Sequence, residues 1–358
     1  MSSPTTLEYV TDLRPAGRRI PRLQELGLLG IILLLGAILG VCGWYSAAPG
    51  FPNLFLNADN LIDGIATPMS VYAIMAVGAT CVIITAGIDI SVGSIFALSA
   101  LGAAAVLQLL PAGASAWVVF PLAVSIPPVI GTLCGLINGL LVVWLRIHPF
   151  IVTLGTMVVF RGIGNVTTPE KRWPDSRHSL PSVFVGKFMR AQLMGIRPMP
   201  MIVMLACVIL GAIYLHTTVA GRKNYAVGGN EEAARFSGVR IGTVKLLVYA
   251  ISGLTAGIAG MVYLGRYATI STNTASGYEL MVIAAAVVGG ASLMGGRGTA
   301  LGALLGTLVI AMIGNGIYTL HLDEEYRSII VGAAIIVAAA LDSKLSERLR
   351  GSRSRAAT

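Results

Sequence analysis

The chain has 358 residues, of which 55% are hydrophobic and only 11% are charged. Soluble domains carry about 25% charged residues, so this composition and the mean hydropathy of +0.81 exclude a soluble globular enzyme, a disordered chain and a disulfide scaffold. The net charge of +9 does not indicate nucleic acid as a partner, because many basic residues flank apolar runs, where they act as topology signals in a lipid bilayer.

Ten apolar segments have the composition of membrane spans, which need about 20 mostly apolar residues. In chain order they are 26–45, 61–86, 91–110, 116–145, 149–165, 199–216, 243–267, 279–293, 299–320 and 326–341. Two of them, 149–165 and 279–293, are short enough for re-entrant or broken helices. Pro68 in the second segment and Pro127-Pro128 in the fourth favour bent helices, because proline removes a backbone donor. The sequence predicts an all-α polytopic membrane protein with about ten transmembrane helices.

Charges around the spans predict the orientation of the chain. The basic residues that flank the first and last spans are Arg14, Arg18, Arg19, Arg22, Lys344, Arg348, Arg350, Arg353 and Arg355. Since basic flanks stay inside, both termini are expected in the cytoplasm, which an even number of spans allows. We expect a cytoplasmic segment 1–25, a transmembrane domain 26–342 with a cytoplasmic loop 217–242, and a cytoplasmic tail 343–358. Counting the spans from a cytoplasmic N-terminus puts the loop 167–197 outside. Its basic residues do not overrule this placement, because long loops follow the charge rule less strictly.

Each half of the chain contains an apolar run that stops at a polar or glycine-rich break and then restarts. The breaks are 87-GIDISVG-93 and 289-GGASLMGGRG-298. Transporters often contain inverted repeats with broken helices, so the breaks suggest two related halves. The second break is not a phosphate-binding loop, because Gly296 stands where a Walker A motif needs lysine. A tight turn between membrane helices is expected there, with Arg297 at the cytoplasmic face.

Polar residues at or near the span ends have two interpretations each. Asp89 lies in the first break, where an ionisable group is a functional candidate. Alternatively, Asp89 or Ser91 caps the helix that starts at Val92. Arg161 ends an apolar run and either lines a path or snorkels to the interface.

Three polar residues, Asn138, Thr153 and Thr156, lie on otherwise apolar spans. Hydrogen bonding between helices is the simplest account of each. The functional alternative is that they line a transport path.

The segment 228-GGNEEAARFSG-238 carries the signals of a short helix outside the membrane. Asn230 is a favourable N-cap, Glu231 and Glu232 follow in the first turn, and Gly238 suits the left-handed end of a helix. These signals predict a helix of about two turns in a cytoplasmic loop.

The same helix would carry a small apolar face made of Ala233, Ala234 and Phe236. This face is too slight for firm anchoring in the lipid interface. Docking in a groove of another protein explains it better than a solvated loop does.

Five segments of the chain, in order, carry a family resemblance: 85-TAGIDISVGSIFALSA-100, 138-NGLLVVWLRIHPFIVTLGTMVVFRG-162, 221-GRKNYAVGGNEEAARFSGV-239, 276-SGYELMVIAAAVVGGASLMGGRGTALGALLG-306 and an apolar span ending at Leu341-Asp342. Together they resemble the ribose/xylose/arabinose/galactose type of sugar permease of ABC importers. Met281 departs from the pattern of this family, since a more polar residue is expected after Tyr-Glu-Leu.

The resemblance implies a permease subunit in a bacterial inner membrane that moves a monosaccharide inward. It also implies three partners: a separate ABC ATPase that hydrolyses ATP, a periplasmic sugar-binding protein, and a second permease copy or paralogue. Residues expected to couple to the ATPase are Gly229, Asn230, Glu231, Glu232, Ala233, Ala234, Arg235, Phe236, Ser237 and Gly238. Candidates for the substrate path are Asp89, Asn138, Thr153, Thr156, Arg161 and Glu279.

The alternative function is a stand-alone ion- or proton-coupled secondary transporter. It predicts acids buried in mid-span, whereas Asp89 and Glu279 lie near span ends. The sequence shows no catalytic set, no metal motif and no cofactor motif, so an enzyme is not expected. The cysteines have no CxxC spacing and are expected as small buried hydrophobes; they are Cys42, Cys81, Cys134 and Cys207.

Overall fold

The computed structural model describes residues 20–46, 53–111, 113–168, 170–193 and 195–320, together with 322–323, 325–327, 329–334, 336–337 and 340. Within this part of the chain, seven helices are long and apolar enough to cross a membrane. They are α1 (Ile20–Ser46), η1 (Asn60–Ala66) continued by α2 (Thr67–Ile84), α4 (Ala116–Leu145), α5 (Pro149–Thr167), α6 (Met199–Thr217), α9 (Ile241–Tyr267) and α11 (Ala300–Thr319). The prediction of an all-α polytopic membrane protein is confirmed.

Two further apolar helices are too short to cross a bilayer. α3 (Val92–Leu107) has 16 residues and α10 (Tyr278–Val288) has 11. At 1.5 Å per residue they extend about 24 and 16 Å, against a hydrocarbon core of about 30 Å. A full helical crossing by 91–110 is therefore wrong, whereas the expectation of a broken helix at 279–293 is confirmed.

The short helices have a local cause in the two predicted breaks. Residues 85–91 are irregular before α3 begins, and the segment 289–299 turns after α10 ends. Gly290, Gly295 and Gly296 in this second break have φ values of +93°, +81° and +74°, which L-residues with a Cβ rarely adopt. The tenth expected span, 326–341, lies partly outside the described residues.

Proline acts differently in the two helices for which bends were expected. Pro68 is the second residue of α2, which directly follows the π-helix η1. The helical geometry therefore changes next to Pro68, where a bend was expected. α4, in contrast, is a single helix through Pro121, Pro127 and Pro128.

The core is centred on α2, α3, α4 and α9, whose buried residues form one large apolar cluster. α4 and α9 approach each other most closely where Gly131 and Gly135 face Gly253 and Gly257. Small residues let helix backbones meet in lipid, where packing replaces the hydrophobic effect as the source of helix association.

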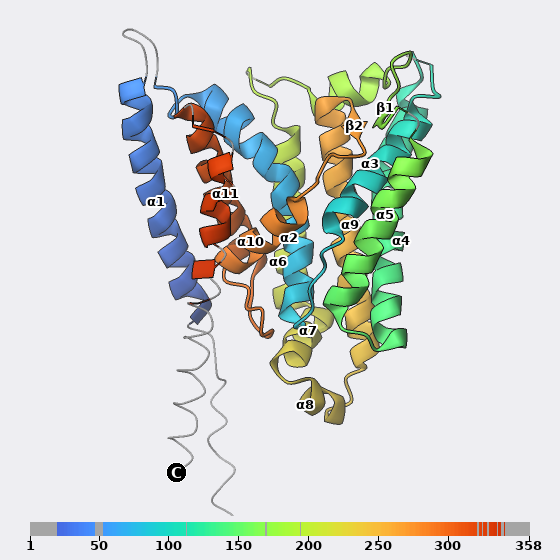
Figure 1. The fold of residues 1–358 in the computed structure, drawn as a ribbon, viewed down its shortest axis with the longest axis vertical. Helices are drawn as coiled ribbons and strands as arrows, with labels where there is room; N and C mark the ends of the chain where they lie inside the picture. Colours follow the sequence, from blue (N-terminus) through green and yellow to red (C-terminus); the bar gives the residue numbers. More distant parts are fainter. Residues whose placement is uncertain are drawn as a thin grey trace, which may run out of the picture.

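The elements outside the long helices lie at two opposite ends of the molecule (Figure 1). α7 (Val219–Gly229) and α8 (Glu231–Phe236) lie at one end, where α1 begins. β1 (Arg172–Trp173), β2 (Ile270–Ser271) and η2 (Val183–Met189) lie at the other. β1 and β2 pair antiparallel, so the segment 170–178, which we call the 170s segment, contacts the residues that directly follow α9.

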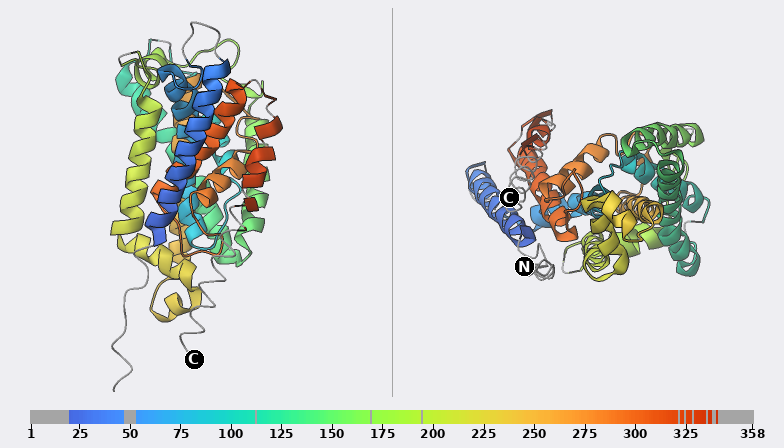
Figure 2. Two further views of the ribbon diagram at one scale, coloured as in Figure 1. Left: turned by 90° about the vertical axis from the view of Figure 1, so that its left-hand side faces the viewer. Right: turned by 90° about the horizontal axis from the view of Figure 1, so that it is seen from below.

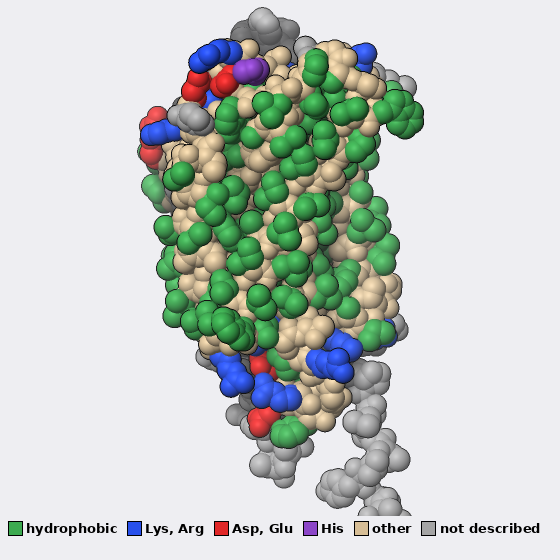
Figure 3. Space-filling model, turned by 90° about the vertical axis from the view of Figure 1, so that its right-hand side faces the viewer, with side chains coloured by type: hydrophobic (Ala, Val, Ile, Leu, Met, Phe, Trp, Pro, Cys, Tyr) green, Lys and Arg blue, Asp and Glu red, His purple; other side chains and the backbone are tan. Residues whose placement is uncertain are grey.

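The surface agrees with a bilayer between these two ends. On the face shown in Figure 3, hydrophobic side chains are spread over the middle of the molecule and charged side chains gather at both ends. Seen from below, α1 lies at one edge of an elongated cross-section, with α4 and α5 at the opposite edge (Figure 2).

We predict that the α8 end faces the cytoplasm. Ser179 and Ser237 are both exposed and belong to opposite ends. In a cysteine-free background, an impermeant thiol reagent added outside should label a cysteine at 179 but not at 237. Labelling of 237 alone would invert the topology, and labelling of both would indicate a misplaced span.

Candidate functional site

The short helix α8 is built by the end signals that its sequence contains. Asn230 Oδ1 accepts the N–H of Ala233 at 2.9 Å, Glu231 and Glu232 occupy the first turn, and Gly238 follows with φ +82°. The predicted helix and both of its boundaries are confirmed.

The two sides of α8 have different environments. Ala234 is 5% exposed and packs in a small cluster with Val227, Ile241 and Val244 of the same chain. Phe236, in contrast, is 84% exposed. The expected apolar face of Ala233, Ala234 and Phe236 is therefore not one surface: Ala234 fixes α8 to its own protein, and Phe236 projects into solvent.

An ion pair fixes the orientation of α8 relative to α9. Glu231 Oε2 lies 2.8 Å from Lys245 Nζ, and Glu231 Oε1 lies 3.3 Å from an Arg235 nitrogen. Because Lys245 belongs to α9, this ion pair connects α8 to a helix that is long and apolar enough to cross a membrane.

The helix α7, which the sequence did not indicate, joins α8 to both breaks. Gly228, near its end, packs so closely on Ile84 that a Cβ would overlap the carbonyl oxygen of Ile84. That oxygen accepts the N–H of Gly296 at 2.8 Å, and the Tyr225 hydroxyl donates to the carbonyl of Gly298 at 2.8 Å. We call these five residues the α7 junction: it connects the end of α2, the turn 289–299 and the short helix.

The turn 289–299 also holds Arg297, which donates to Ser292 Oγ at 3.5 Å. The turn contacts the end of α7, so it lies on the same side of the molecule as α8.

The carboxylate of Asp89 lies in the buried core, where it is 2% exposed. Its Oδ1 accepts the N–H and hydroxyl of Ser91 at 3.0 and 2.6 Å, and its Oδ2 accepts the Ser252 hydroxyl of α9 at 2.8 Å. The expected capping of α3 is wrong in its proposed form, because no side chain of Ser91 or Asp89 accepts a helical N–H of α3. Asp89 instead holds the first break against α9.

Asn138 and Thr153 complete this buried cluster. Asn138 Nδ2 donates to Ser91 Oγ at 2.7 Å, and Thr153 Oγ1 accepts the N–H of Ile90 at 3.2 Å. Both residues are 0% exposed, so they act as the interhelical hydrogen bonds that were expected. Thr156 donates to the Thr153 carbonyl of its own helix.

The other two path candidates, Arg161 of α5 and Glu279 of α10, contact each other. Arg161 donates to Ser276 Oγ at 3.0 Å, and its Nη2 lies 4.0 Å from Glu279 Oε2. The side chain of Arg161 therefore points to α10, and its position relative to the membrane interface stays a prediction. Glu279 is 8% exposed, and neither its Oε2 nor the Arg161 Nη2 has a hydrogen bond within the described structure.

Glu279 also lies beside two helix N-termini. Its Oε1 accepts the N–H of Gly277 at 3.3 Å, and the absence of a Cβ on Gly93, near the start of α3, leaves room for Oε2. These contacts place the Glu279 carboxyl group beside the first residues of α10 and α3.

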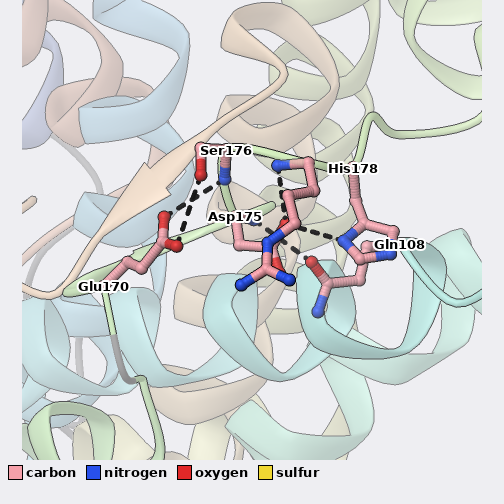
Figure 4. Close-up of polar contacts among 6 residues, drawn as sticks. Gln108, Glu170, Asp175, Ser176 and His178 are labelled. Atoms are coloured by element: carbon pink, nitrogen blue, oxygen red, sulfur yellow. Dashed lines mark hydrogen bonds and ion pairs between the residues drawn. The ribbon is translucent and has the colours of Figure 1, made fainter.

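At the opposite end from α8, the 170s segment is ordered by side-chain contacts (Figure 4). Gln108 accepts the N–H of Asp175 at 3.2 Å, and Glu170 accepts the N–H of Ser176 at 3.1 Å. Asp175 Oδ1 lies 2.6 Å from His178 Nδ1, and this hydrogen bond lowers the pKa of the Asp175 carboxyl. These contacts order the segment 170–178 at the end of the molecule opposite α8.

Among the described residues, no group of three His, Cys, Asp or Glu side chains could hold a metal ion. All four cysteines are free thiols; Cys81 and Cys134 are buried, whereas Cys42 and Cys207 are partly exposed.

Comparison with known proteins gives one family. Residues 61–339 match the family described as branched-chain amino acid transport system / permease component. No solved structure matches the chain.

The curated relatives include permeases named for several sugars. The ribose import permease of Bacillus subtilis is 35% identical over 331 residues, which cover 88% of this chain and 95% of that protein. The D-allose permease of Escherichia coli is 35% identical, with 89% and 92% covered. The galactose/methyl galactoside import permease of Escherichia coli is 34% identical, with 90% and 94% covered.

Proposed function

The chain belongs to the family of transport-system permease components, and we propose that it is the membrane permease of an ATP-driven importer that carries a monosaccharide into the cytoplasm. The observation that carries this proposal is α8, a capped helix outside the membrane that is fixed to its own chain on one side and exposes Phe236 on the other. The sugar names of the relatives support a pentose or hexose as the substrate.

Hydrolysis of ATP is assigned to a separate ABC ATPase, because the glycine-rich turn lacks the lysine of a Walker A motif. A binding protein outside would deliver the sugar. The relatives are named as import permeases, and the matching family is described as the permease component of a transport system, which favours a permease subunit over a stand-alone proton-coupled transporter.

We propose that movement of the ATPase reaches the membrane through α8. The pair Glu231–Lys245 connects α8 to α9, and the α7 junction connects it to α2 and the turn 289–299. Both breaks of the membrane helices are therefore attached to the coupling segment. Such an arrangement suits a switch between two rigid states, each favoured by ligand contacts on one side.

Phe236→Asp should abolish sugar uptake and release the ATPase, while membrane insertion stays normal. An exposed aromatic side chain that fills a partner's pocket typically contributes about 2 kcal/mol or more to binding, which is roughly a 30-fold change in Kd. Co-purification of the ATPase and uptake by cells measure the two effects.

Phe236→Leu is the matched control, because it keeps an apolar side chain at the tip and should retain most of the binding. Full uptake by Phe236→Asp would mean that α8 is only a solvated loop. Ala234→Asp is not a test of docking, since Ala234 packs inside its own chain and the charge would disturb α8 itself.

Two permease chains, or this chain and a paralogue, should assemble with one pair of ATPases. The chain offers one short helix of this kind, α8, within its described residues, whereas an ABC importer has two nucleotide sites. Mass measurement of the complex in detergent should give two permease chains per ATPase pair. A stable complex with a single permease chain contradicts this stoichiometry.

A further inference from the structure

A cavity of about 420 Å³ lies between η1, the start of α2 and α11, away from the residues that the sequence indicated. This volume falls within the range of about 300–1,000 Å³ that is typical of small-molecule sites. Its polar lining residues are Asn60, Asp63, Tyr72, Thr307, Asn315, Tyr318 and Arg327. Since η1 lies at the end opposite α8 (Figure 1), the cavity belongs to the half of the molecule assigned to the outside.

The π-helical geometry of η1 contributes three residues to this cavity. Asn60, Asp63 and Gly64 all line it and all belong to the seven-residue π-helix. π-Helical segments are rare and occur frequently at functional sites, because the wider turn displaces side chains from their α-helical positions.

Two amides form a rigid polar wall. Asn60 Nδ2 donates to Asn315 Oδ1 at 3.0 Å, and Asn315 Nδ2 donates to Asn60 Oδ1 at 2.7 Å. Gly64 makes room for this pair, since a Cβ there would overlap Asn60 Oδ1 and lie 3.0 Å from Asn315 Nδ2. Asn60 Nδ2 also donates to the carbonyl of Phe55 at 3.0 Å, and Asn315 Oδ1 also accepts the Thr319 hydroxyl at 3.4 Å. The pair therefore keeps one further N–H on Asn315 and a spare lone pair on Asn60 Oδ1, which suit a hydroxyl group.

The carboxylate of Asp63 is held in place from the side of α9. Its Oδ1 lies 3.0 Å from Arg266 Nη2, and Arg266 in turn lies with its guanidinium 5.9 Å from the ring centre of Tyr267. The side chain of Asp63 is nevertheless 36% exposed, so its carboxylate is fixed but accessible to a ligand.

One lining residue of the cavity contacts the helix that carries Glu279. Tyr72, in its lining, packs on Tyr278 with ring centroids 4.7 Å apart, and Tyr278 is the neighbour of Glu279 in α10. Aromatic rings offer a surface for the C–H face of a sugar, while amides and carboxylates bind its hydroxyls.

We propose that this cavity is the first binding site of the permease for a neutral polyhydroxylated ligand, from which the sugar passes along Tyr72 and Tyr278 toward Glu279 and Arg161. The inference rests on the proposed import function. It assigns a ligand class to a site built from amide, carboxylate, phenol and aliphatic surface.

The test uses the complete complex of permease, ATPase and binding protein in proteoliposomes, with D-ribose, D-allose and D-galactose as probes. Asp63→Asn removes the carboxylate charge, and Ala311→Phe fills the cavity from α11. Sugar uptake and ATP hydrolysis are measured together, so that the number of sugars moved per ATP is obtained.

Asp63→Asn should lower uptake per ATP by roughly tenfold, the effect of losing one hydrogen bond to a charged group. Ala311→Phe should lower it at least as far because it fills the cavity, while the binding protein still stimulates ATP hydrolysis in both variants. Saturation-transfer NMR of the same sugars with the purified complex without binding protein should lose its signal in Ala311→Phe. The matched controls are Asp59→Asn, which is exposed one position before η1 and makes no side-chain cap, and Leu301→Phe on the exposed face of α11.

Unchanged uptake per ATP in both variants overturns the cavity as a sugar site and leaves the import function standing. An equal loss in the two control variants also overturns it, because the effect would then be structural. Failure of the unaltered complex to move any of the three sugars overturns the sugar-import proposal together with the site.

Discussion

Gly135→Val is expected to prevent the chain from folding into a stable membrane protein. An added Cβ at Gly135 would overlap the carbonyl oxygen of Tyr249, and Gly131 and Gly253 make the same kind of contact one turn away. α4 and α9 form the most extensive helix pair of the structure, so separating them disturbs the whole core. Overpacking typically costs about 1–3 kcal/mol, and contact with rigid backbone places this variant at or above the upper limit.

The measurement is the yield of monodisperse protein in detergent and its thermal unfolding temperature. Gly155→Val is the matched control, because Gly155 lies in α5 with nothing within 4 Å of an added Cβ. We expect the control to be stable and Gly135→Val to aggregate or be degraded. Equal stability of the two variants would mean that α4 and α9 do not approach as closely as described.

Gly228→Ala is expected to abolish transport while the chain still inserts and folds. Its Cβ would overlap the carbonyl oxygen of Ile84, which accepts the N–H of Gly296. The methyl group must displace α7 from the end of α2 or break this hydrogen bond, at a cost of about 1–3 kcal/mol. Because the α7 junction lies between α8 and the two breaks, we expect uptake to fall by about tenfold or more.

The neighbouring residue gives an internal control of the same chemistry. Gly229→Ala has open space around its Cβ, and alanine favours a helix by about 1 kcal/mol over glycine, so this variant should leave the α7 junction intact. Any loss of uptake in it would come with weaker co-purification of the ATPase, because Gly229 belongs to the segment expected to bind the ATPase. ATP hydrolysis, ATPase co-purification and uptake are measured in parallel. Hydrolysis that persists without uptake in Gly228→Ala indicates lost coupling, whereas normal uptake shows that the junction does not transmit the movement.

Local signals were sufficient for α8 and for the breaks. The N-cap of Asn230 and the left-handed φ of Gly238 depend on residues within one or two turns, so the sequence predicted the helix with its ends. The same holds for the end of the short helix α10, because the glycines that follow it favour a turn whatever the surrounding structure. Apolar length alone, however, suggested a crossing at 91–110, where the helix α3 spans only Val92–Leu107.

The helix α7 shows why some elements escape sequence analysis. Its sequence, Val219–Gly229, contains three glycines and little apolar periodicity, so local propensity does not favour a helix. Packing against α6, α8 and α9 stabilises it instead. Tertiary contacts commonly override weak local preference in this way.

The sequence by itself determined the solvent, the helical class and the short helix outside the membrane, because composition, apolar length and capping act within one segment. Only the tertiary structure decided which polar residues act together. It joined Asp89 to Ser252 across 163 positions, paired Arg161 with Glu279, and brought Asn60 to Asn315 across 255 positions at the cavity. It also turned Ala234 inward and Phe236 outward. The physical reason is that these contacts depend on how helices pack against one another, and the spacing of residues along a single helix does not specify its neighbours.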